Sequence, residues 1–127
     1  MPRDSMVRLK AFQVNEKTRQ RDMLATTIDD FSRMADDLSA QILNEEKRSG
    51  ITDPDHFAYP MTAKAARTRR DKLHESAKEL KVQLDAASIA LEEAEAELAK
   101  AEALERRDGR APVATEAPAP RRSGMIG

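Results

Sequence analysis

The chain has 127 residues, a formal net charge of −1, 35% charged side chains and only 3% aromatic ones. This length allows one domain at most, and the scarcity of aromatic residues argues against an ordinary globular core; such compositions are typical of long helices or coiled coils. The small net charge gives no reason to expect nucleic acid or an acidic membrane as a partner, and the absence of cysteine excludes disulfide and thiol chemistry.

The first predicted element is a helix over about residues 5–48. From the middle of this segment onward its apolar residues alternate four and three positions apart, which is the heptad pattern of a coiled-coil seam. These seam residues are Leu24, Ile28, Phe31, Ala35, Leu38 and Ile42. The same frame extended towards the N-terminus gives Val14, Lys17 and Arg21, so the seam becomes polar there.

The central segment, residues 49–61, is predicted to turn the chain. Within its "TDPDHFAYP" stretch, Asp53 is expected to cap a short turn that has Pro54 in the first helical position. Phe57 and Tyr59 are expected to cover the apolar end of the seam. The alternative is that these two aromatic side chains form a docking surface.

Basic residues follow directly after the turn. They are Lys64, Arg67, Arg69, Arg70 and Lys72. We expect a solvated basic face that pairs with the nearby acids Glu45, Glu46 and Asp71. Phosphate binding is the alternative, but the acidic run "EEAEAE" later in the same segment would repel a nucleic-acid backbone, so no nucleic-acid partner is expected.

The second predicted helix covers about residues 62–107 and keeps the heptad alternation for four full repeats. Its seam residues are Leu73, Ala77, Leu80, Leu84, Ala87, Leu91, Ala94, Leu98 and Ala101. Glutamate, lysine and aspartate fill most positions between them, as expected for a helix with one buried stripe.

Short polar residues and glycines mark the expected helix ends. Asp4 or Ser5 is expected to cap the first helix, because a short side-chain acceptor can bond a free amide of the first turn. Thr62 is expected to cap the second helix in the same way. Gly50 and Gly109 are expected to end the two helices.

Two seams of matched length joined by a short break predict an all-α fold, a long antiparallel two-helix coiled-coil hairpin over residues 1–108. In this arrangement apolar residues face each other near the turn, whereas Lys17 and Arg21 lie over alanine and leucine near the termini. Alanine buries little apolar area, so the terminal half is expected to be the weaker one. A parallel homodimer through either helix is the alternative, which heptads alone do not exclude.

The remaining residues, 109–127, are expected to form a disordered tail. Their sequence, "GRAPVATEAPAPRRSGMIG", is rich in proline and alanine, and such a segment cannot bury enough surface to offset its chain entropy.

No motif for catalysis, cofactor binding or metal binding stands out. Asp53, Asp55 and His56 are interpreted as a capped turn, because His74 is the only other histidine to complete a metal site. No Gly-rich phosphate loop, GxSxG or HExxH is present, and a two-helix hairpin is expected to offer no concave pocket. The start of the chain lacks the apolar run of a signal peptide, and no stretch approaches a membrane span, so we expect a soluble cytoplasmic protein that is not an enzyme.

Three stretches together resemble one known family. They are "RDSMVRLKAFQVNEKTRQ" near the start, "EEKRSGITDPDHFAYP" across the turn, and "AKAARTRRDKL" after it. The sequence resembles the FliJ family of flagellar type III export proteins, in the form that carries an HFAYP-like turn. The resemblance covers about residues 3–108, and the first two stretches are its specific part.

The resemblance implies a cytoplasmic component of the flagellar export apparatus, peripheral to the inner membrane at the flagellar base and needed for motility and chemotaxis. Members of the family are antiparallel two-helix coiled coils similar to the central stalk of rotary ATPases. Their paired terminal ends engage the hexameric export ATPase ring. They also contact the large membrane protein of the export gate and cycle with the chaperones of export substrates, without inserting into the membrane.

Two groups of candidate contact residues follow. For the ATPase-contacting open end they are Val14, Lys17, Arg21, Leu91 and Leu98. For the tip that contacts the gate or another partner they are Phe57, Tyr59, Arg67, Arg69, Arg70 and Leu73; the tip residues are chosen for their type and clustering.

Two other functions remain open at this point. A general chaperone would bind clients along the Ala-rich seam at residues 86–103. A purely structural spacer would depend on the length of the hairpin and not on the identity of its surface.

Overall fold

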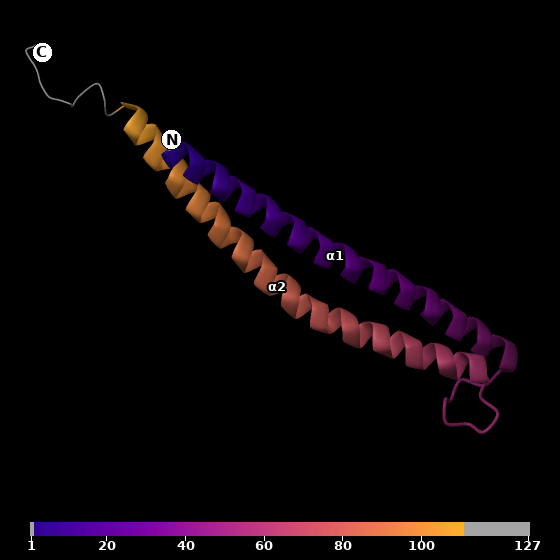
Figure 1. Cartoon of the computed structure of the whole chain (residues 1–127). Helices are drawn as coiled ribbons and strands as arrows, with labels where there is room; N and C mark the ends of the chain where they lie inside the picture. The colour runs from indigo at the N-terminus through magenta and orange to yellow at the C-terminus, as the bar shows by residue number, and fades with distance from the viewer. Residues whose placement is uncertain (1, 111–127) are drawn as a thin grey trace, which may run out of the picture. The chain divides into compact units, whose positions relative to one another are not determined.

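The computed structural model describes residues 2–110, which form two helices, α1 (Pro2–Ser49) and α2 (Met61–Arg110), joined by a non-helical segment at residues 50–60 (Figure 1). The two helices run in opposite directions as an antiparallel hairpin, which confirms the predicted all-α fold. Of the tail predicted over residues 109–127, only its first two residues are described, and both belong to α2; the rest lies outside the described residues.

The start of α1 differs from the prediction. The helix begins at Pro2, so Asp4 and Ser5 lie inside it and do not cap it. Proline is well suited to the first turn of a helix, since its missing N–H has no partner within the helix there.

The end of α1 is as predicted. Gly50 adopts a φ of 74°, and its N–H donates to the carbonyl oxygen of Glu46 at 2.8 Å. A residue without Cβ enters this left-handed conformation at little cost, so Gly50 stops the helix.

The predicted ends of α2 are both shifted. The helix begins at Met61, and the carbonyl of Pro60 accepts the first bond, from the N–H of Lys64 at 3.0 Å. Thr62 therefore lies in the first turn and is not the cap. Gly109 lies inside the helix without a left-handed φ, so the prediction that it ends α2 is wrong.

The chain separates into two compact units, which we describe individually. The turn unit comprises residues 20–87, that is, the end of α1, the connecting segment and the start of α2. Of the described residues, the terminal unit comprises 2–19 together with 88–110.

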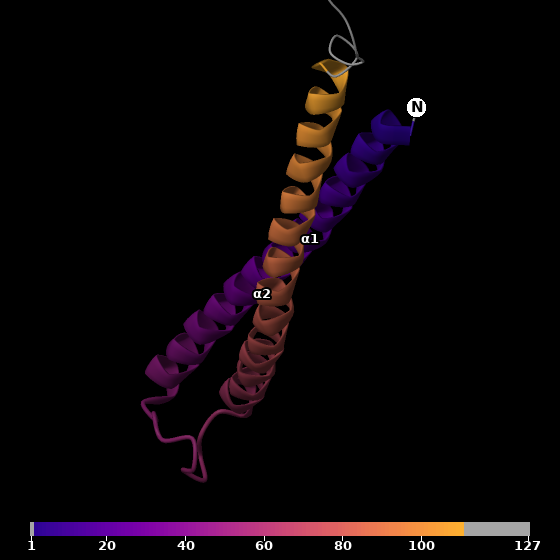
Figure 2. The ribbon, with the colours of Figure 1, turned by 90° about the vertical axis from the view of Figure 1, so that its left-hand side faces the viewer.

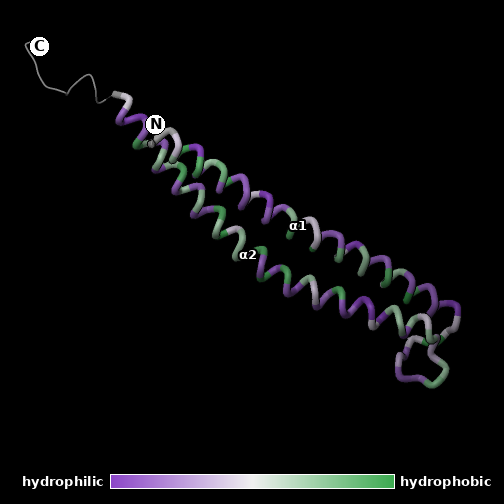
Figure 3. Tube along the Cα trace, in the orientation of Figure 1, coloured by the Kyte–Doolittle hydropathy of each residue, from purple (hydrophilic) through white to green (hydrophobic). Residues whose placement is uncertain are grey.

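The core of the turn unit lies on the predicted seam. Leu38 and Ile42 of α1 form a buried cluster with Ala66 of α2, and Leu73 packs against it. The other predicted seam positions of this unit are buried or half-buried: Leu24, Ile28, Phe31 and Ala35 on α1, and Ala77, Leu80, Leu84 and Ala87 on α2. Apolar positions thus recur among polar ones along both helices (Figure 3).

The segment between the helices, which Figure 2 shows as an open loop between the end of α1 and the start of α2, contributes one more core residue. Tyr59 is buried, as are Ala63 and Ala66 in the first two turns of α2. Small side chains at these two buried positions let the backbones of the two helices approach each other closely.

The terminal unit has a thinner core. Leu91 and Ala101 are buried, and Val14 and Leu98 are half-buried. Lys10 Nζ on α1 lies 3.8 Å from Glu97 Oε1 on α2, so an ion pair also joins the two helices here. Among residues 2–110, no helix has an apolar stretch of the kind that crosses a membrane.

Candidate partner-binding surfaces

The turn is built around Asp53. Its side-chain Oδ1 accepts a hydrogen bond from the N–H of Asp55, and its carbonyl accepts one from the N–H of His56, both at 3.0 Å. An aspartate that bonds its own backbone two residues ahead forms an Asx turn, which confirms the predicted cap. In the part of the chain that the structure describes, no three His, Cys, Asp or Glu side chains are grouped as metal ligands.

The two aromatic residues of the turn have opposite environments. Tyr59 is 6% exposed, whereas Phe57 is 97% exposed and stacks on the His56 ring with a centroid distance of 4.8 Å. His56 is itself fixed, since its Nδ1 accepts a hydrogen bond from the N–H of Ala58 at 2.9 Å. The prediction that both aromatics cover the seam is correct for Tyr59 and wrong for Phe57.

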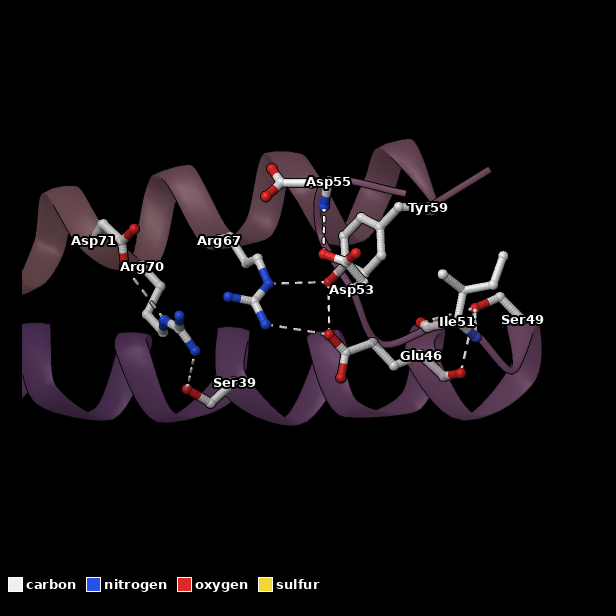
Figure 4. Close-up of polar contacts among 10 residues, drawn as sticks. All are labelled: Ser39, Glu46, Ser49, Ile51, Asp53, Asp55, Tyr59, Arg67, Arg70 and Asp71. Atoms are coloured by element: carbon white, nitrogen blue, oxygen red, sulfur yellow. Dashed lines mark hydrogen bonds and ion pairs between the residues drawn. The ribbon is translucent and has the colours of Figure 1, made fainter. Parts of the chain in front are cut away.

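Tyr59 joins the two helices through a polar triad, Glu46–Tyr59–Arg67 (Figure 4). The Tyr59 hydroxyl donates to Glu46 Oε2 at 2.7 Å and accepts a hydrogen bond from Arg67 Nε at 3.0 Å. Arg67 Nη2 also donates to Glu46 Oε2, at 3.2 Å. Each of the three side chains bonds the other two, so the triad ties the end of α1 to the start of α2.

The triad changes the acidity of its members. The hydrogen bond from Tyr59 is the main cause that lowers the pKa of Glu46, and the hydrogen bond and charge of Arg67 and the charge of Arg70 lower it further, against the opposing effect of burial. The same bonds, from Tyr59 first and then from Glu46, raise the pKa of Arg67. Both shifts favour the ionised forms of the pair.

A pH dependence of stability follows from the Glu46 carboxyl. Its pKa is lower in the folded chain than in the unfolded one, where it is about 4.3. Its stabilising contribution is therefore complete above that unfolded value and is lost as the pH falls through the lower folded value. Urea unfolding at several pH values gives the difference in the free energy of unfolding between the wild type and Glu46→Gln. We expect this gap to be constant near neutral pH and to become smaller in acid.

Tyr59→Phe is the matched control for this titration, because it removes the largest cause of the shift and leaves the carboxyl in place. In that background the gap caused by Glu46→Gln should narrow less in acid. If the gap between the wild type and Glu46→Gln did not change with pH, the lowered pKa of Glu46 would be contradicted.

Arg70 is the second basic residue whose side chain makes polar contacts within the hairpin (Figure 4). Its Nη1 donates to Ser39 Oγ on α1 at 3.5 Å, and its Nε, which makes no hydrogen bond, lies 3.6 Å from Asp71 Oδ1. The predicted pairing of the basic face with Glu46 and Asp71 is thus confirmed. Glu45 bonds Arg48 of its own helix instead, at 2.7 Å.

The predicted tip residues therefore divide by accessibility. Tyr59, Arg67 and Arg70 are engaged within the hairpin, and Leu73 packs against the core. Phe57 and Arg69 are exposed and free to meet another molecule. That the tip binds a partner stays a prediction, with these two residues as its accessible members.

A groove runs beside the seam of the turn unit, so the prediction that a two-helix hairpin offers no concave pocket is wrong. Its volume is about 530 Å³, and it is lined by Met34, Asp37, Leu38, Gln41, Arg69, Lys72, Leu73 and Ser76. Sequence analysis missed Met34 and Asp37 altogether, because both lie outside the seam frame. The available signal was that Met34, Asp37 and Gln41 follow one another at steps of three and four residues, as the seam residues do.

The predicted open-end residues are also divided. Val14, Lys17, Leu91 and Leu98 belong to the terminal unit, where Leu91 is buried and the other three are half-buried. Arg21 belongs to the turn unit, and its Nη2 is bonded to Asp22 Oδ1 at 2.8 Å. The structure thus does not bring Arg21 into one unit with the other four.

The terminal unit exposes a group of apolar side chains that sequence analysis did not select. On α1 these are Met6, Leu9 and Phe12, which recur every three residues and are 46%, 49% and 60% exposed. On α2, Leu104 of the same unit is 43% exposed. We call these four residues the terminal apolar group.

Comparison with models of protein families, with curated proteins and with solved structures gave no match. The fold and surfaces therefore define only a structural class. The chain is an antiparallel helical hairpin with a polar triad at its turn, a groove beside its seam and a terminal apolar group.

Proposed function

We propose that this protein is a non-enzymatic cytoplasmic component of the flagellar type III export apparatus, acting as a stalk-like partner of the export ATPase ring. It links the ring to the membrane export gate and cycles with the chaperones of export substrates at the inner membrane. The antiparallel hairpin supports this proposal, since it is the fold that the FliJ-like segments at residues 3–20 and 45–60 imply.

The observation that carries the proposal is the terminal apolar group. Met6, Leu9 and Phe12 lie within about two turns of α1, and about half of each side chain is exposed to water. An exposed apolar cluster of this kind marks a protein-binding site, and a partner that covers it stabilises the bound form. The resemblance implies that the paired termini enter the ATPase ring, and these residues are at that end.

The gate contact is the less constrained part of the proposal. Phe57 and Arg69 are the two predicted tip residues that remain accessible, and exposed aromatic and arginine side chains are enriched at protein interfaces. We assign the contact with the gate to the end of the hairpin that carries them.

ATP hydrolysis by the flagellar export ATPase, measured with and without the purified chain, tests the stalk role. We expect stimulated hydrolysis and more hexamer in sedimentation. Phe12→Glu should raise the concentration needed for half-maximal stimulation by about tenfold or more, because a charge replaces an apolar contact at the interface. Phe12 is 60% exposed, so the fold should be unaffected.

Val82→Glu is the matched control, because Val82 is 70% exposed but belongs to the turn unit. It should stimulate hydrolysis as the wild type does. Absence of stimulation by saturating wild-type protein, or equal loss in both variants, would refute the stalk role.

The chaperone alternative is less well supported by the structure. Of the Ala-rich seam at residues 86–103, Leu91 and Ala101 are buried and Ala94 and Leu98 are half-buried against α1. A client reaches this seam only if the helices separate. Suppressed aggregation of unrelated proteins, without any effect on the ATPase, would favour that alternative.

A further inference from the structure

The groove beside the seam has an apolar floor and belongs entirely to the turn unit. Leu38 and Leu73 of the core form part of its lining, together with Met34, which is 49% exposed. Half of the Met34 side chain is therefore in contact with water in a concave site, where a second apolar surface would displace that water.

The two rims of the groove carry opposite charges. Arg69 and Lys72 form the rim on α2; both are exposed, and neither makes an ion pair or side-chain hydrogen bond within residues 2–110. Arg67 and Arg70, on the same helix, are by contrast occupied by Glu46 and Ser39. Two cations of α2 without such partners thus lie on the groove side.

The rim on α1 is acidic. Asp37 lines the groove and is exposed, and Asp36 beside it is exposed as well. Arg33, the cation closest in sequence, is already bonded to Asp29 and Asp30. The α1 rim therefore offers the Asp37 carboxylate, and the α2 rim offers the two cations Arg69 and Lys72.

The lining residues keep the spacing of a coiled coil. On α1, Met34, Asp37 and Gln41 are three and four residues apart, and on α2, Arg69, Lys72 and Ser76 repeat the same spacing. Each residue of the α1 set comes directly before a seam position, and so do Lys72 and Ser76 of the α2 set. The groove therefore follows the two-helix seam. A third helix packed there would extend the bundle with the same knobs-into-holes geometry.

We propose that this groove binds an amphipathic helix of a partner protein, whose apolar stripe has carboxylates along one border and lysines or arginines along the other. The carboxylates face Arg69 and Lys72, and the bases face Asp37. The proposal goes beyond the export function and does not depend on it, because it rests only on the shape, apolar floor and charge of the groove. A nucleic-acid backbone fits poorly, since it has no apolar stripe and would meet Asp37.

A designed peptide tests the proposal without any flagellar protein. The probe is a fluorescein-labelled helical peptide with a leucine stripe, glutamate on one border and lysine on the other; a second peptide has lysine on both borders. Fluorescence anisotropy with the full chain should show binding of the first peptide and about tenfold weaker binding of the second, because charge complementarity selects between them.

Charge reversal in the groove should invert this preference. The double variant Arg69→Glu, Lys72→Glu should bind the lysine-only peptide more tightly than the first peptide. Met34→Glu should weaken the binding of both peptides. The matched control is Lys78→Glu with Lys81→Glu, which reverses two exposed cations that have the same spacing on α2 and do not line the groove. It should bind both peptides as the wild type does, and circular dichroism should show unchanged helicity for every variant.

Several results would overturn the proposal. These are no binding of the first peptide at about 100 μM, equal binding of the two peptides, or an equal effect of the groove and control reversals. Sedimentation equilibrium adds one more: a wild-type dimer that Met34→Glu dissociates would show that a second copy of the chain occupies the groove instead.

Discussion

Replacing Tyr59 by alanine is expected to destabilise the hairpin by about 3 kcal/mol, whereas the same truncation of Phe57 should change stability by less than about 0.5 kcal/mol. The two residues are both aromatic and lie two positions apart in the turn. Only Tyr59 is buried, at 6% exposure, and only its hydroxyl bridges Glu46 and Arg67.

The size of the Tyr59 effect has two sources. The ring packs at the end of the seam, and its removal leaves a cavity that the surrounding helices fill only in part. The hydroxyl is the second source, and Tyr59→Phe isolates it: we expect that change alone to cost about 1 kcal/mol, since it removes one hydrogen bond to a carboxylate and one from a guanidinium.

Urea unfolding followed by circular dichroism measures all three variants on one scale. Phe57→Ala is the matched control, since it removes an aromatic ring from the same turn at a position 97% exposed. Equal losses for Tyr59→Ala and Phe57→Ala would show that the turn does not hold the two rings as described. We expect the loss of stability to be largest for Tyr59→Ala, smaller for Tyr59→Phe and smallest for Phe57→Ala.

The turn also shows where sequence analysis reaches its limit. The helices and their direction could be predicted, because one seam with a period of three and four residues runs through each segment and a glycine separates them. The seam residues Leu38, Ile42 and Leu73 are where the heptads put them. Helices and their buried faces can be predicted from long periodic segments, because the period is present in the sequence itself.

The environments of Phe57 and Tyr59 could not be predicted in this way. Both precede α2 in a segment without period, and no local rule decides which ring turns inward. The choice depends on partners 13 residues before Tyr59 and 8 residues after it, namely Glu46 and Arg67. Such long-range bonds form only once the hairpin has brought both helices together.

The surfaces were missed for a related reason. Met34 and Asp37 do not belong to the seam, so the heptad frame alone gives them no role; they form a groove only because Arg69 and Lys72 lie opposite them. Phe12 likewise falls outside the seam and is 60% exposed. The heptad pattern predicts which face of a helix is buried. A binding surface formed by both helices can be predicted only when the position of the second helix is known.

The close approach of the two helices near the turn leads to the second large effect. Ala66→Leu is expected to destabilise the hairpin by about 1–3 kcal/mol, because three added carbon atoms must fit a site that is 0% exposed and already filled by Leu38 and Ile42. Relief requires α2 to move away from α1. That movement would also shift Arg67, the next residue, away from Glu46 and weaken the triad.

Ala65→Leu is the matched control for this substitution. Ala65 precedes Ala66 on the same helix but is exposed, and leucine is nearly as good a helix former as alanine, so the change should stay within about 0.5 kcal/mol. Urea unfolding of both variants measures the difference. If Ala66→Leu were as stable as Ala65→Leu, the helices would not be in close contact at Ala66. The geometry of the adjoining groove would then be wrong as well.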